Sequence, residues 1–312
     1  MARSAPPTAD TARRLEWQML PRPLRDLIER RCGSPVVSAH TRNRGFTPGF
    51  ASVLECEDGS RHFVKAASLR AQGIFAHAYR EEARKLMALP EDVPAPRLLW
   101  SYDGEWVALG IDHVEGRHPV RPWTTGDLDS CLDALETVAD RLTPAPQDLE
   151  LDPAAEEFAP FLANWDDVRT ARPDLLHLDE AVALASRYAE VMAGDTVVHT
   201  DVRDDNVLID TDGRAWFCDW NWPVAGADWL DSLLMLIGPR GDGLDVEDVI
   251  AQRPLLRDVP AESIDVVIAL VTAYFLKSAD DPVPATSPFL REHQRWQGEV
   301  CWEWLCERRG WA

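Results

Sequence analysis

The sequence predicts an α+β fold with two lobes: an N-terminal lobe built on a five-stranded antiparallel sheet, and a mainly helical C-terminal lobe. Its 312 residues exceed the roughly 250–300 residues at which a single hydrophobic core stops growing. Short runs of β-branched and aromatic residues, separated by turn residues, lie between residues 36 and 114. Helical periodicity dominates from residue 125 onward. We therefore expect an N-terminal lobe at residues 1–114 and a C-terminal lobe at residues 115–312.

The N-terminal lobe should begin with a short helix, because Leu24, Leu27 and Ile28 recur at helical spacing before Gly33. Three strands are expected near residues 36–43, 50–57 and 61–66, where β-branched and aromatic runs are separated by turn residues. A longer helix follows over residues 69–89, with apolar residues on one face and charges on the other. The segments "RLLWSY" and "EWVALGIDHV" flank an Asp-Gly turn and predict a hairpin, which completes five strands.

The second lobe begins after "VEGRHPVRPWTTG", which is rich in proline and glycine and has no periodicity. Helices are expected near residues 125–142, 179–193, 228–237, 261–277 and 287–307. Residues 196–219 are the part of this lobe with β character, and Asp212-Gly213 predicts a hairpin there.

The composition excludes several classes of function. The hydrophobic fraction of 46% and the charged fraction of 27% are typical of a globular protein. A net charge of −21 argues against a nucleic-acid partner, which requires clustered lysine and arginine. No apolar run approaches the ~20 residues that cross a bilayer, and the start lacks the apolar stretch of a secretion signal. We expect a cytoplasmic protein with no membrane partner, either a monomer or a homodimer. Its six scattered cysteines are expected to be buried free thiols.

The segment "VVHTDVRDDNVLI", residues 197–209, places charged residues between apolar residues that are suited to burial. It contains His199, Asp201 and Asn206 in the order H-x-D-x-x-x-x-N, and Asp219 follows after the next hairpin. Groups that move a proton or hold a metal need such a packed apolar frame at strand ends. The spacing is that of the catalytic loop and metal aspartate in protein-kinase-like phosphotransferases.

The longer segment "VVHTDVRDDNVLIDTDGRAWFCDWNWP" resembles the aminoglycoside phosphotransferase family, which has a protein-kinase-like fold. The resemblance implies a kinase that uses ATP and Mg²⁺. In that reading Asp201 is the catalytic base for the acceptor hydroxyl, and Arg203 holds the γ-phosphate. Asn206 and Asp219 supply the hard oxygen ligands that Mg²⁺ prefers. His199 is expected to brace the loop by hydrogen bonding, and Asp231 further on to act as a cap or brace.

The resemblance extends upstream of the catalytic loop. Lys65 ends an alternating strand, where the family keeps the lysine that grips the nucleotide phosphates. Glu81 and Glu82 lie on the following helix, and the alanine after Glu82 favours it as the partner of Lys65, which leaves Glu81 in solvent.

Two further parts of a nucleotide site follow from the same resemblance. The loop over the phosphates would include Gly45, Phe46 and Thr47, although it lacks the G-x-G-x-x-G pattern and Pro48 removes a backbone donor. Backbone groups of Asp112 and Val114 would hold the adenine.

The acceptor is the least constrained part of the prediction. Residues 145–180 contain ten acids against two arginines, which suits either a solvated surface or a cleft that draws in a cationic substrate. Trp165, Asp166, Asp167 and Trp222 are the candidate substrate contacts. The family resemblance favours a hydroxylated small molecule, aminoglycoside-like or another basic natural product, with antibiotic resistance as the implied role.

Three alternatives remain at this stage. A metabolite kinase would phosphorylate a sugar, homoserine or choline type of alcohol, since family motifs fix the nucleotide half and leave the acceptor open. A pseudokinase would bind nucleotide without turnover. A metal hydrolase would use His199, Asp201 and Asp219 as ligands of a transition metal and would leave Lys65 unexplained.

Overall fold

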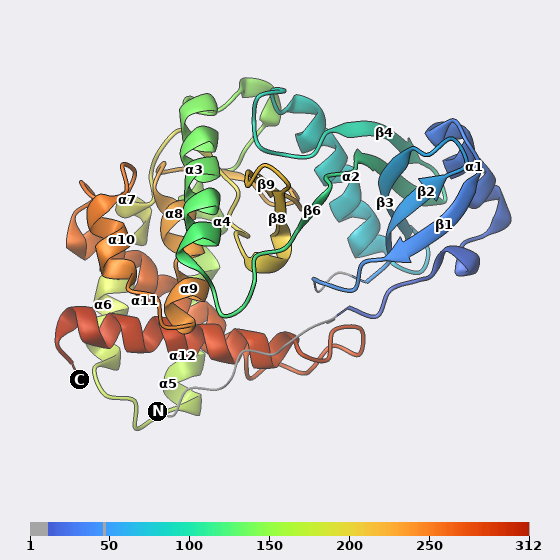
Figure 1. Ribbon diagram of the computed structural model, residues 1–312. Helices are drawn as coiled ribbons and strands as arrows, with labels where there is room; N and C mark the ends of the chain where they lie inside the picture. Colours follow the sequence, from blue (N-terminus) through green and yellow to red (C-terminus); the bar gives the residue numbers. More distant parts are fainter. Residues whose placement is uncertain (1–11, 46–47, 312) are drawn as a thin grey trace.

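The computed structural model describes residues 12–45 and 48–311. Two lobes lie at opposite ends of the molecule, one built on a sheet and the other on helices (Figure 1). The small strands β8 (Val207–Asp210) and β9 (Ala215–Phe217) lie between them. No helix in the described part of the chain is long and apolar enough to span a bilayer.

The first lobe contains the expected five-stranded antiparallel sheet. Its strands are β1 (Val36–Thr41), β2 (Phe50–Cys56), β3 (Arg61–Ser68), β4 (Leu98–Asp103) and β5 (Trp106–Asp112), in the order β1-β2-β3-β5-β4. The pairing sets Lys65 of β3 opposite Leu109 of β5 and Ala51 of β2. Lys65 thus lies in the central strand, and its backbone is held on both sides.

Helices cover both faces of this sheet. Helix α1 (Arg22–Cys32) ends at Gly33, whose φ of +84° suits glycine, and it buries Leu24 and Ile28 against β2 and β3. The turn η1 (Trp17–Met19) joins this small core through Trp17. Helix α2 (Gly73–Ala88) covers the other face, toward the second lobe. Successive side chains of β3 therefore alternate between the core under α1 and the face toward the helical lobe.

The second lobe is mainly helical. Its helices are α3 (Thr125–Arg141), α4 (Ala154–Glu157), α5 (Ala159–Ala171), α6 (Leu178–Ala185), α7 (Tyr188–Val191), α8 (Leu230–Met235), α9 (Ile237–Gly241), α10 (Val246–Gln252), α11 (Ala261–Ser278) and α12 (Leu290–Arg309), with the turns η2 (Gln147–Leu149) and η3 (Asp204–Asn206). Two small sheets complete it: β6 (Gly116–Arg117) pairs with β8 and β8 with β9, while β7 (Thr196–Val198) pairs with β10 (Val224–Gly226).

Several elements of this lobe differ from the sequence-based expectation. The helix expected near residues 179–193 is two helices, α6 and α7, separated at Ser186 and Arg187. Helices α5 and α10 and the short strands β6 and β10 were not expected. Helix α5 mixes acids with aromatic residues and has little periodicity of its own, and it forms where Trp165 and Val168 become buried against α11.

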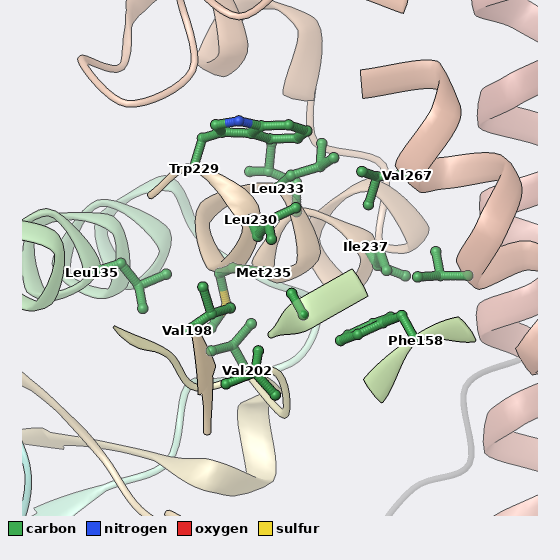
Figure 2. Close-up of a cluster of buried hydrophobic side chains, with 14 of the residues drawn as sticks. Leu135, Phe158, Val198, Val202, Trp229, Leu230, Leu233, Met235, Ile237 and Val267 are labelled. Carbon is green, nitrogen blue, oxygen red and sulfur yellow. The ribbon is translucent and has the colours of Figure 1, made fainter. Parts of the chain in front are cut away.

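The core of the helical lobe supports the segment before and after Asp201. Val198 and Val202 are 2% and 4% exposed and lie among side chains from α8, α9 and α11 (Figure 2). Burying two β-branched side chains four positions apart fixes the backbone between them. The charged loop is therefore short and anchored on both sides.

We propose that the lobes divide at residues 114 and 115. Strand β5 of the first sheet ends at Asp112, and Gly116 already pairs with Asp210 of β8. The connection between the sheets is thus only three residues long.

Candidate active site

The loop between β7 and β8 is shaped by one buried carboxylate. Asp231, at the start of α8, accepts hydrogen bonds from the backbone N–H groups of His199 (2.6 Å) and Thr200 (2.9 Å). Thr200 has a φ of +70°, a conformation that costs a β-branched residue about 1–3 kcal/mol. Asp231 is 5% exposed, and burial raises the pKa of its carboxyl. It is the brace that the sequence predicted.

His199 also braces the loop. Its Nε2 lies 2.9 Å from the Cys218 carbonyl oxygen, and its Nδ1 lies 3.3 Å from the Asp201 N–H. The first contact requires a proton on Nε2 and the second a lone pair on Nδ1, so one neutral tautomer satisfies both. Because both nitrogens bind backbone, the metal-hydrolase alternative, which needs His199 as a ligand, does not fit.

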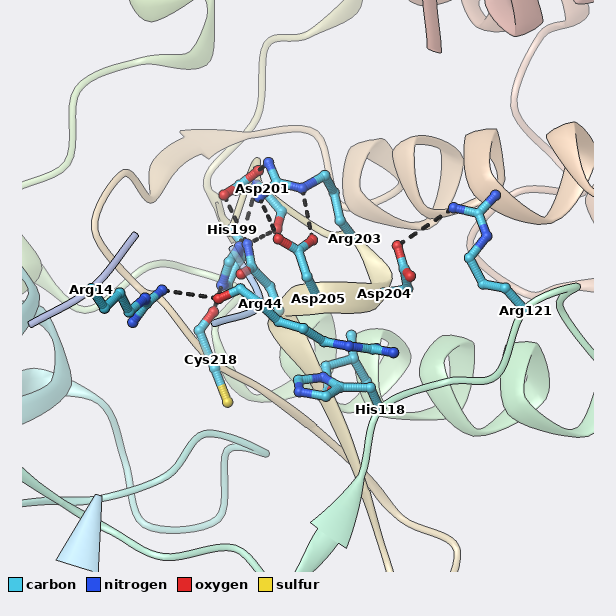
Figure 3. Close-up of polar contacts among 12 residues, drawn as sticks. Arg14, Arg44, His118, Arg121, His199, Asp201, Arg203, Asp204, Asp205 and Cys218 are labelled. Carbon is cyan, nitrogen blue, oxygen red and sulfur yellow. Dashed lines mark hydrogen bonds and ion pairs between the residues drawn. The ribbon is translucent and has the colours of Figure 1, made fainter. Parts of the chain in front are cut away.

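The carboxylate of Asp201 is oriented by two neighbours. Asn206 Nδ2 donates to Asp201 Oδ2 (2.8 Å) and to its carbonyl oxygen (2.9 Å), and Arg203 Nη1 donates to Oδ1. Arg203 also binds Asp205 Oδ1 through Nε (2.9 Å). Burial alone would lower the pKa of Arg203, but these two carboxylates outweigh it and raise the pKa. Figure 3 shows this group of charges together on the loop.

A second group of charges joins the two lobes. Lys65 Nζ donates to Glu82 Oε1 (2.7 Å) and Oε2 (3.0 Å) and also contacts Asp219 Oδ1. The sequence-based choice of Glu82 over Glu81 agrees with this geometry. Lys65 comes from the sheet, Glu82 from α2, and Asp219 from the helical lobe directly after β9, where its φ is +65°. Three elements thus converge on one ammonium group.

One lysine is shared here by the buried carboxylate of Glu82 and the partly buried carboxylate of Asp219. Burial would lower the pKa of Lys65, but Asp219 and Glu82 outweigh it and raise the pKa. Burial raises the pKa of Glu82 to about 7 despite the lysine, and nearby Asp219 adds to the rise. The pKa of Asp219 is lowered, because the charge and hydrogen bond of Lys65 exceed the cost of its burial. The group has more negative than positive charge, which suits an additional cation.

These residues line a cleft between the lobes. It encloses about 950 Å³, including its open part, and its walls include Lys65, Glu82, Asn206 and Asp219. Asp112 and Val114 lie in the same wall, as the adenine prediction requires. Asp201 is not in the wall but is connected to it through Asn206.

Four basic side chains line the cleft although the chain carries a net charge of −21: Arg14, Arg42, Arg44 and Lys65. Sequence reasoning did not single out the three arginines: Arg14 lies in a segment without periodicity, and the direction of the Arg42 and Arg44 side chains could not be read from the strand and loop expected there. Arg14 Nη2 donates to the Arg44 carbonyl oxygen (2.9 Å) (Figure 3). Its charge opposes the rise in the pKa of Glu82 and contributes to the lowered pKa of Asp219.

The backbone holds Arg14 in place. Leu15 N–H donates to the Gly49 carbonyl oxygen (2.8 Å), and Leu15 forms a parallel bridge with Phe50 at the start of β2. Arg13 N–H donates to the Thr286 carbonyl oxygen (3.0 Å), close to the start of α12. This segment, residues 12–15, therefore contacts both lobes.

The loop predicted to lie over the phosphates is only partly described. Phe46 and Thr47 lie outside the described residues. Gly45 has a φ of +93°, and an added Cβ would lie 3.1 Å from Arg14 Nη2 and 3.8 Å from Asp205 Oδ2. Gly45 therefore lies between Arg14 and the catalytic loop.

The predicted acceptor residues do not form one cluster. The structure corrects the expectation for Trp165, which is 1% exposed and packs edge-on against Trp302 in the core, so its ring presents no face to a substrate. Asp166 and Asp167 are exposed on α5. Trp222 is 55% exposed, and its carbonyl oxygen accepts a hydrogen bond from Thr200 Oγ1 (3.1 Å), so it stays a candidate beside the catalytic loop.

An aromatic pair near Asp201 was missed by sequence reasoning. Phe161 of α5 stacks on Tyr274 of α11, with ring centroids 4.2 Å apart. Burial raises the pKa of Tyr274, and the charge of Asp201 adds to the rise. Helix α5, which also carries Asp166, therefore contacts α11 through Phe161.

Comparisons with known proteins agree with the fold and the motifs. Residues 50–222, more than half of the chain, match the model of the phosphotransferase enzyme family. No curated protein sequence matches the chain significantly.

Solved structures with the same fold are similar over most of their length. An aminoglycoside phosphotransferase from Alicyclobacillus acidocaldarius has a TM-score of 0.57 at 14% identity, over 88% of this chain and 92% of its own. An AMP-bound spectinomycin phosphotransferase has a TM-score of 0.61 at 12% identity, over 90% and 98%. A choline kinase from Streptococcus pneumoniae has a TM-score of 0.55 at 11% identity, over 90% and 99%. At these identities the structures establish the protein-kinase-like fold, and the match over residues 50–222 shows that the chain belongs to the phosphotransferase enzyme family, as a small-molecule kinase.

Proposed function

We propose that this phosphotransferase moves the γ-phosphoryl group of ATP, with Mg²⁺, to a hydroxyl of a small basic natural product, aminoglycoside-like in its density of amines and hydroxyls. The observation that carries the proposal is the contact of Lys65 with both Glu82 and Asp219 in the cleft, beside the Asn206–Asp201 pair. A triphosphate in this cleft would meet a lysine from one lobe and the metal ligands and base from the other.

The walls of the cleft suit the parts of a nucleotide. Lys65 would bind the α- and β-phosphates, and Arg14 and Arg44 would add positive charge in place of the glycine-rich loop. Asp112 and Val114, where β5 leads into the second lobe, would pair with the adenine through their backbone groups. The apolar side chains of Val53, Leu86, Ile111 and Leu208 line the same cleft and can enclose a flat ring.

The donor set fits Mg²⁺. Asn206 uses its Nδ2 to bind Asp201, which leaves its amide oxygen as a ligand. Asp219 adds a carboxylate whose negative charge Lys65 offsets only in part. Hard oxygen donors of this kind, with substrate phosphates completing the shell, are typical of Mg²⁺ sites in kinases. When bound, the ion would neutralise charge that develops on the phosphates during transfer.

Asp201 is the proposed base. The acceptor hydroxyl would donate its hydrogen bond to the Asp201 carboxylate, which takes the proton as the oxygen attacks phosphorus. Asn206 and Arg203 hold that carboxylate at two points, so it loses little freedom when the acceptor arrives. The contact of Arg203 with the γ-phosphate stays a prediction, since its guanidinium already binds Asp201 and Asp205.

The acceptor would lie beside α5 and the catalytic loop. Trp222 offers an exposed aromatic face, and Asp166 and Asp167 add negative charge on the helix that carries Phe161. An aromatic face and carboxylates are each suited to contact a cationic, hydroxylated ligand. The family resemblance implies the same acceptor class. The alternative is a metabolite kinase that phosphorylates a sugar, homoserine or choline type of alcohol.

A panel of acceptors tests the proposal. ADP release with Mg-ATP would be measured against aminoglycosides, a macrolide, choline, homoserine and neutral sugars, and phosphorus NMR would identify the product. We expect turnover with polyamine antibiotics. Turnover confined to neutral sugars would overturn the acceptor class and leave phosphoryl transfer in place. If neither nucleotide binding nor ADP release occurred with any acceptor, the whole proposal would be wrong.

A further inference from the structure

A second cluster of reactive side chains lies on the other face of the N-terminal sheet. The Sγ atoms of Cys32 and Cys56 and a ring nitrogen of His62 all lie within 4.8 Å of one another. They come from the end of α1, the end of β2 and the start of β3. His62 shares its strand face with Val64, which belongs to the core under α1, whereas Lys65 points to the cleft. The cluster is thus separate from the proposed phosphotransfer site.

The hydrogen bonds around His62 determine its tautomer. Ser60 Oγ has a single proton, which it donates to Asp58 Oδ1 (2.7 Å), so it can only accept from His62 Nε2 (3.2 Å). The Nδ1 atom therefore carries a lone pair. Among the described residues Nδ1 has no hydrogen-bond partner, although it is buried. A buried acceptor without a partner is costly and needs an explanation.

We propose that Cys32, Cys56 and His62 form a binding site for a soft divalent cation such as Zn²⁺. Two thiolates and one imidazole are typical zinc ligands, and the Asp58–Ser60–His62 chain is the kind of outer support that orients a metal-binding histidine. Zinc bonds of about 2.0–2.3 Å set ligand atoms less than about 4 Å apart. The cluster therefore needs only small side-chain rotations to close around an ion.

The surrounding charge favours a cation. The carboxylate of Asp58, which holds Ser60 beside His62, adds negative charge that attracts a positive ion. Binding would release the two thiol protons to solvent as the two sulfur–metal bonds form. Cys32 is half-buried, so an ion can enter and solvent can fill a fourth position.

The expected consequence is structural. The three ligands belong to α1 and to the β2–β3 hairpin, whose turn is closed by the Cys56 N–H to Ser60 carbonyl hydrogen bond (2.9 Å). An ion held by all three would tie α1 to the sheet and stabilise the folded lobe by mass action.

Cobalt binding to the whole reduced protein tests the site. The chain would be freed of metal with a chelator and kept with saturating Mg-ADP, so that the cleft does not take up the probe. Titration with Co²⁺ should give a thiolate-to-cobalt charge-transfer band at one equivalent, and added Zn²⁺ should displace the cobalt and remove the band.

Cys32→Ser and Cys56→Ala should each abolish the band, and His62→Ala should weaken cobalt binding at least tenfold. Cys306→Ser, which removes another half-buried thiol, and His77→Ala, which removes an exposed imidazole, are the matched controls and should leave the titration unchanged.

The outcomes separate the metal site from other uses of the thiols. A wild-type titration without a thiolate band would overturn the proposal, as would a band that survives both cysteine substitutions. If oxidation joined Cys32 to Cys56 in a disulfide and the reduced protein bound no cobalt, the pair would be a redox pair instead. Cys32→Ser changes a half-buried position, so it keeps the test decisive if Cys56→Ala fails to fold. Mg-ADP serves only to keep the probe out of the cleft, and the loss of the thiolate band in the cysteine variants is read without acceptor or turnover, so its failure is distinguishable from failure of the proposed function.

Discussion

Two residues of the site have backbone conformations that most residues avoid. Thr200 and Asp219 have φ values of +70° and +65°. Each is restrained by charge: Asp231 binds the N–H of Thr200, and Lys65 binds the carboxylate of Asp219. Such conformations cost about 1–3 kcal/mol and persist where the surroundings hold them. Two of the four non-glycine residues with positive φ in the described part of the chain therefore lie beside or within the set of residues proposed to act as base and metal ligand.

Replacing Asp201 tests the base at the residue scale. Asp201→Asn keeps the shape of the side chain but cannot accept the acceptor proton, so kcat should fall by about 10²–10⁴-fold. Nucleotide affinity should stay within a few-fold, because Asp201 does not line the nucleotide cleft. Steady-state kinetics with an acceptor from the panel, and calorimetry with Mg-ADP, would measure both.

Asp212→Asn is the matched control for that substitution. Asp212 lies in the exposed β8–β9 turn of the same segment and should tolerate the change. Near-normal turnover of Asp201→Asn would show that the base is another group.

Arg14 provides a test that the motifs alone would not suggest. If its guanidinium binds nucleotide phosphates, Arg14→Met should weaken Mg-ATP and Mg-ADP binding by about tenfold or more, the value of a charge-assisted hydrogen bond. Adenosine has no phosphate, so its affinity should not change. Calorimetry with the three ligands measures the difference. Arg22→Met, at an exposed position on α1, is the control, and an equal loss for adenosine would indicate a merely structural role.

At the scale of elements, α12 brings a buried histidine to the catalytic loop. His293 is 9% exposed, and burial, together with the charges of Arg203 and Arg121, lowers its pKa to about 4, with Asp205 opposing the shift. A histidine in the unfolded chain has a pKa near 6.5. Between these two pKa values His293 is therefore protonated in the unfolded chain and neutral in the folded protein.

The sign of the resulting pH dependence follows directly. Above pH ~6.5 His293 is neutral in both the folded and the unfolded state, so no stability is lost. As the pH falls from ~6.5 to ~4, the unfolded state gains a proton first, and the folded state loses up to about 3 kcal/mol of stability. His293→Gln should remove that part of the loss in urea unfolding between these pH values. His77→Gln, which changes an exposed histidine of α2, should not, and equal slopes for both variants would contradict the assignment.

The elements that could be predicted are those with a strong local signal. The alternation of "HFVKAAS" and the Asp-Gly turns located β3 and both hairpins within a few residues. Helix α5 carries no comparable pattern, because its burial depends on α11, which lies about a hundred residues later. The strand β10 is three residues long and exists through its pairing with β7. Contacts distant in sequence define these elements.

At the scale of the molecule, a nucleotide should stabilise both lobes at once. Mg-ATP at about 100 times its Kd should raise the free energy of unfolding by about 2.7 kcal/mol. Asp219→Asn should lose most of this gain when Mg²⁺ is present, since it removes a metal ligand and the partner of Lys65. Urea unfolding with and without Mg-ATP measures it. Asp212→Asn again serves as the control, and a full gain in Asp219→Asn would exclude the proposed metal site.

The candidate site was predictable where spacing carried the information. Lys65, Glu82, Asn206 and Asp219 converge as the motif order implied. Trp165 was misjudged because aromatic residues beside acids occur in cores as well as in clefts, and the sequence does not show which face is buried. Arg14 could not be found, since its place in the cleft depends on the pairing of its neighbour Leu15 with Phe50, which no local sequence pattern predicts.

Residues 12–15 connect the two lobes through backbone hydrogen bonds. They are bonded to the β1–β2 connection on one side and, through Arg13, to Thr286 on the other. If ADP is released by separation of the lobes, this short segment would have to break the hydrogen bond to Thr286 or move Arg14 away from the phosphates that it is proposed to bind. Product release and nucleotide affinity would then be coupled through a single stretch of backbone.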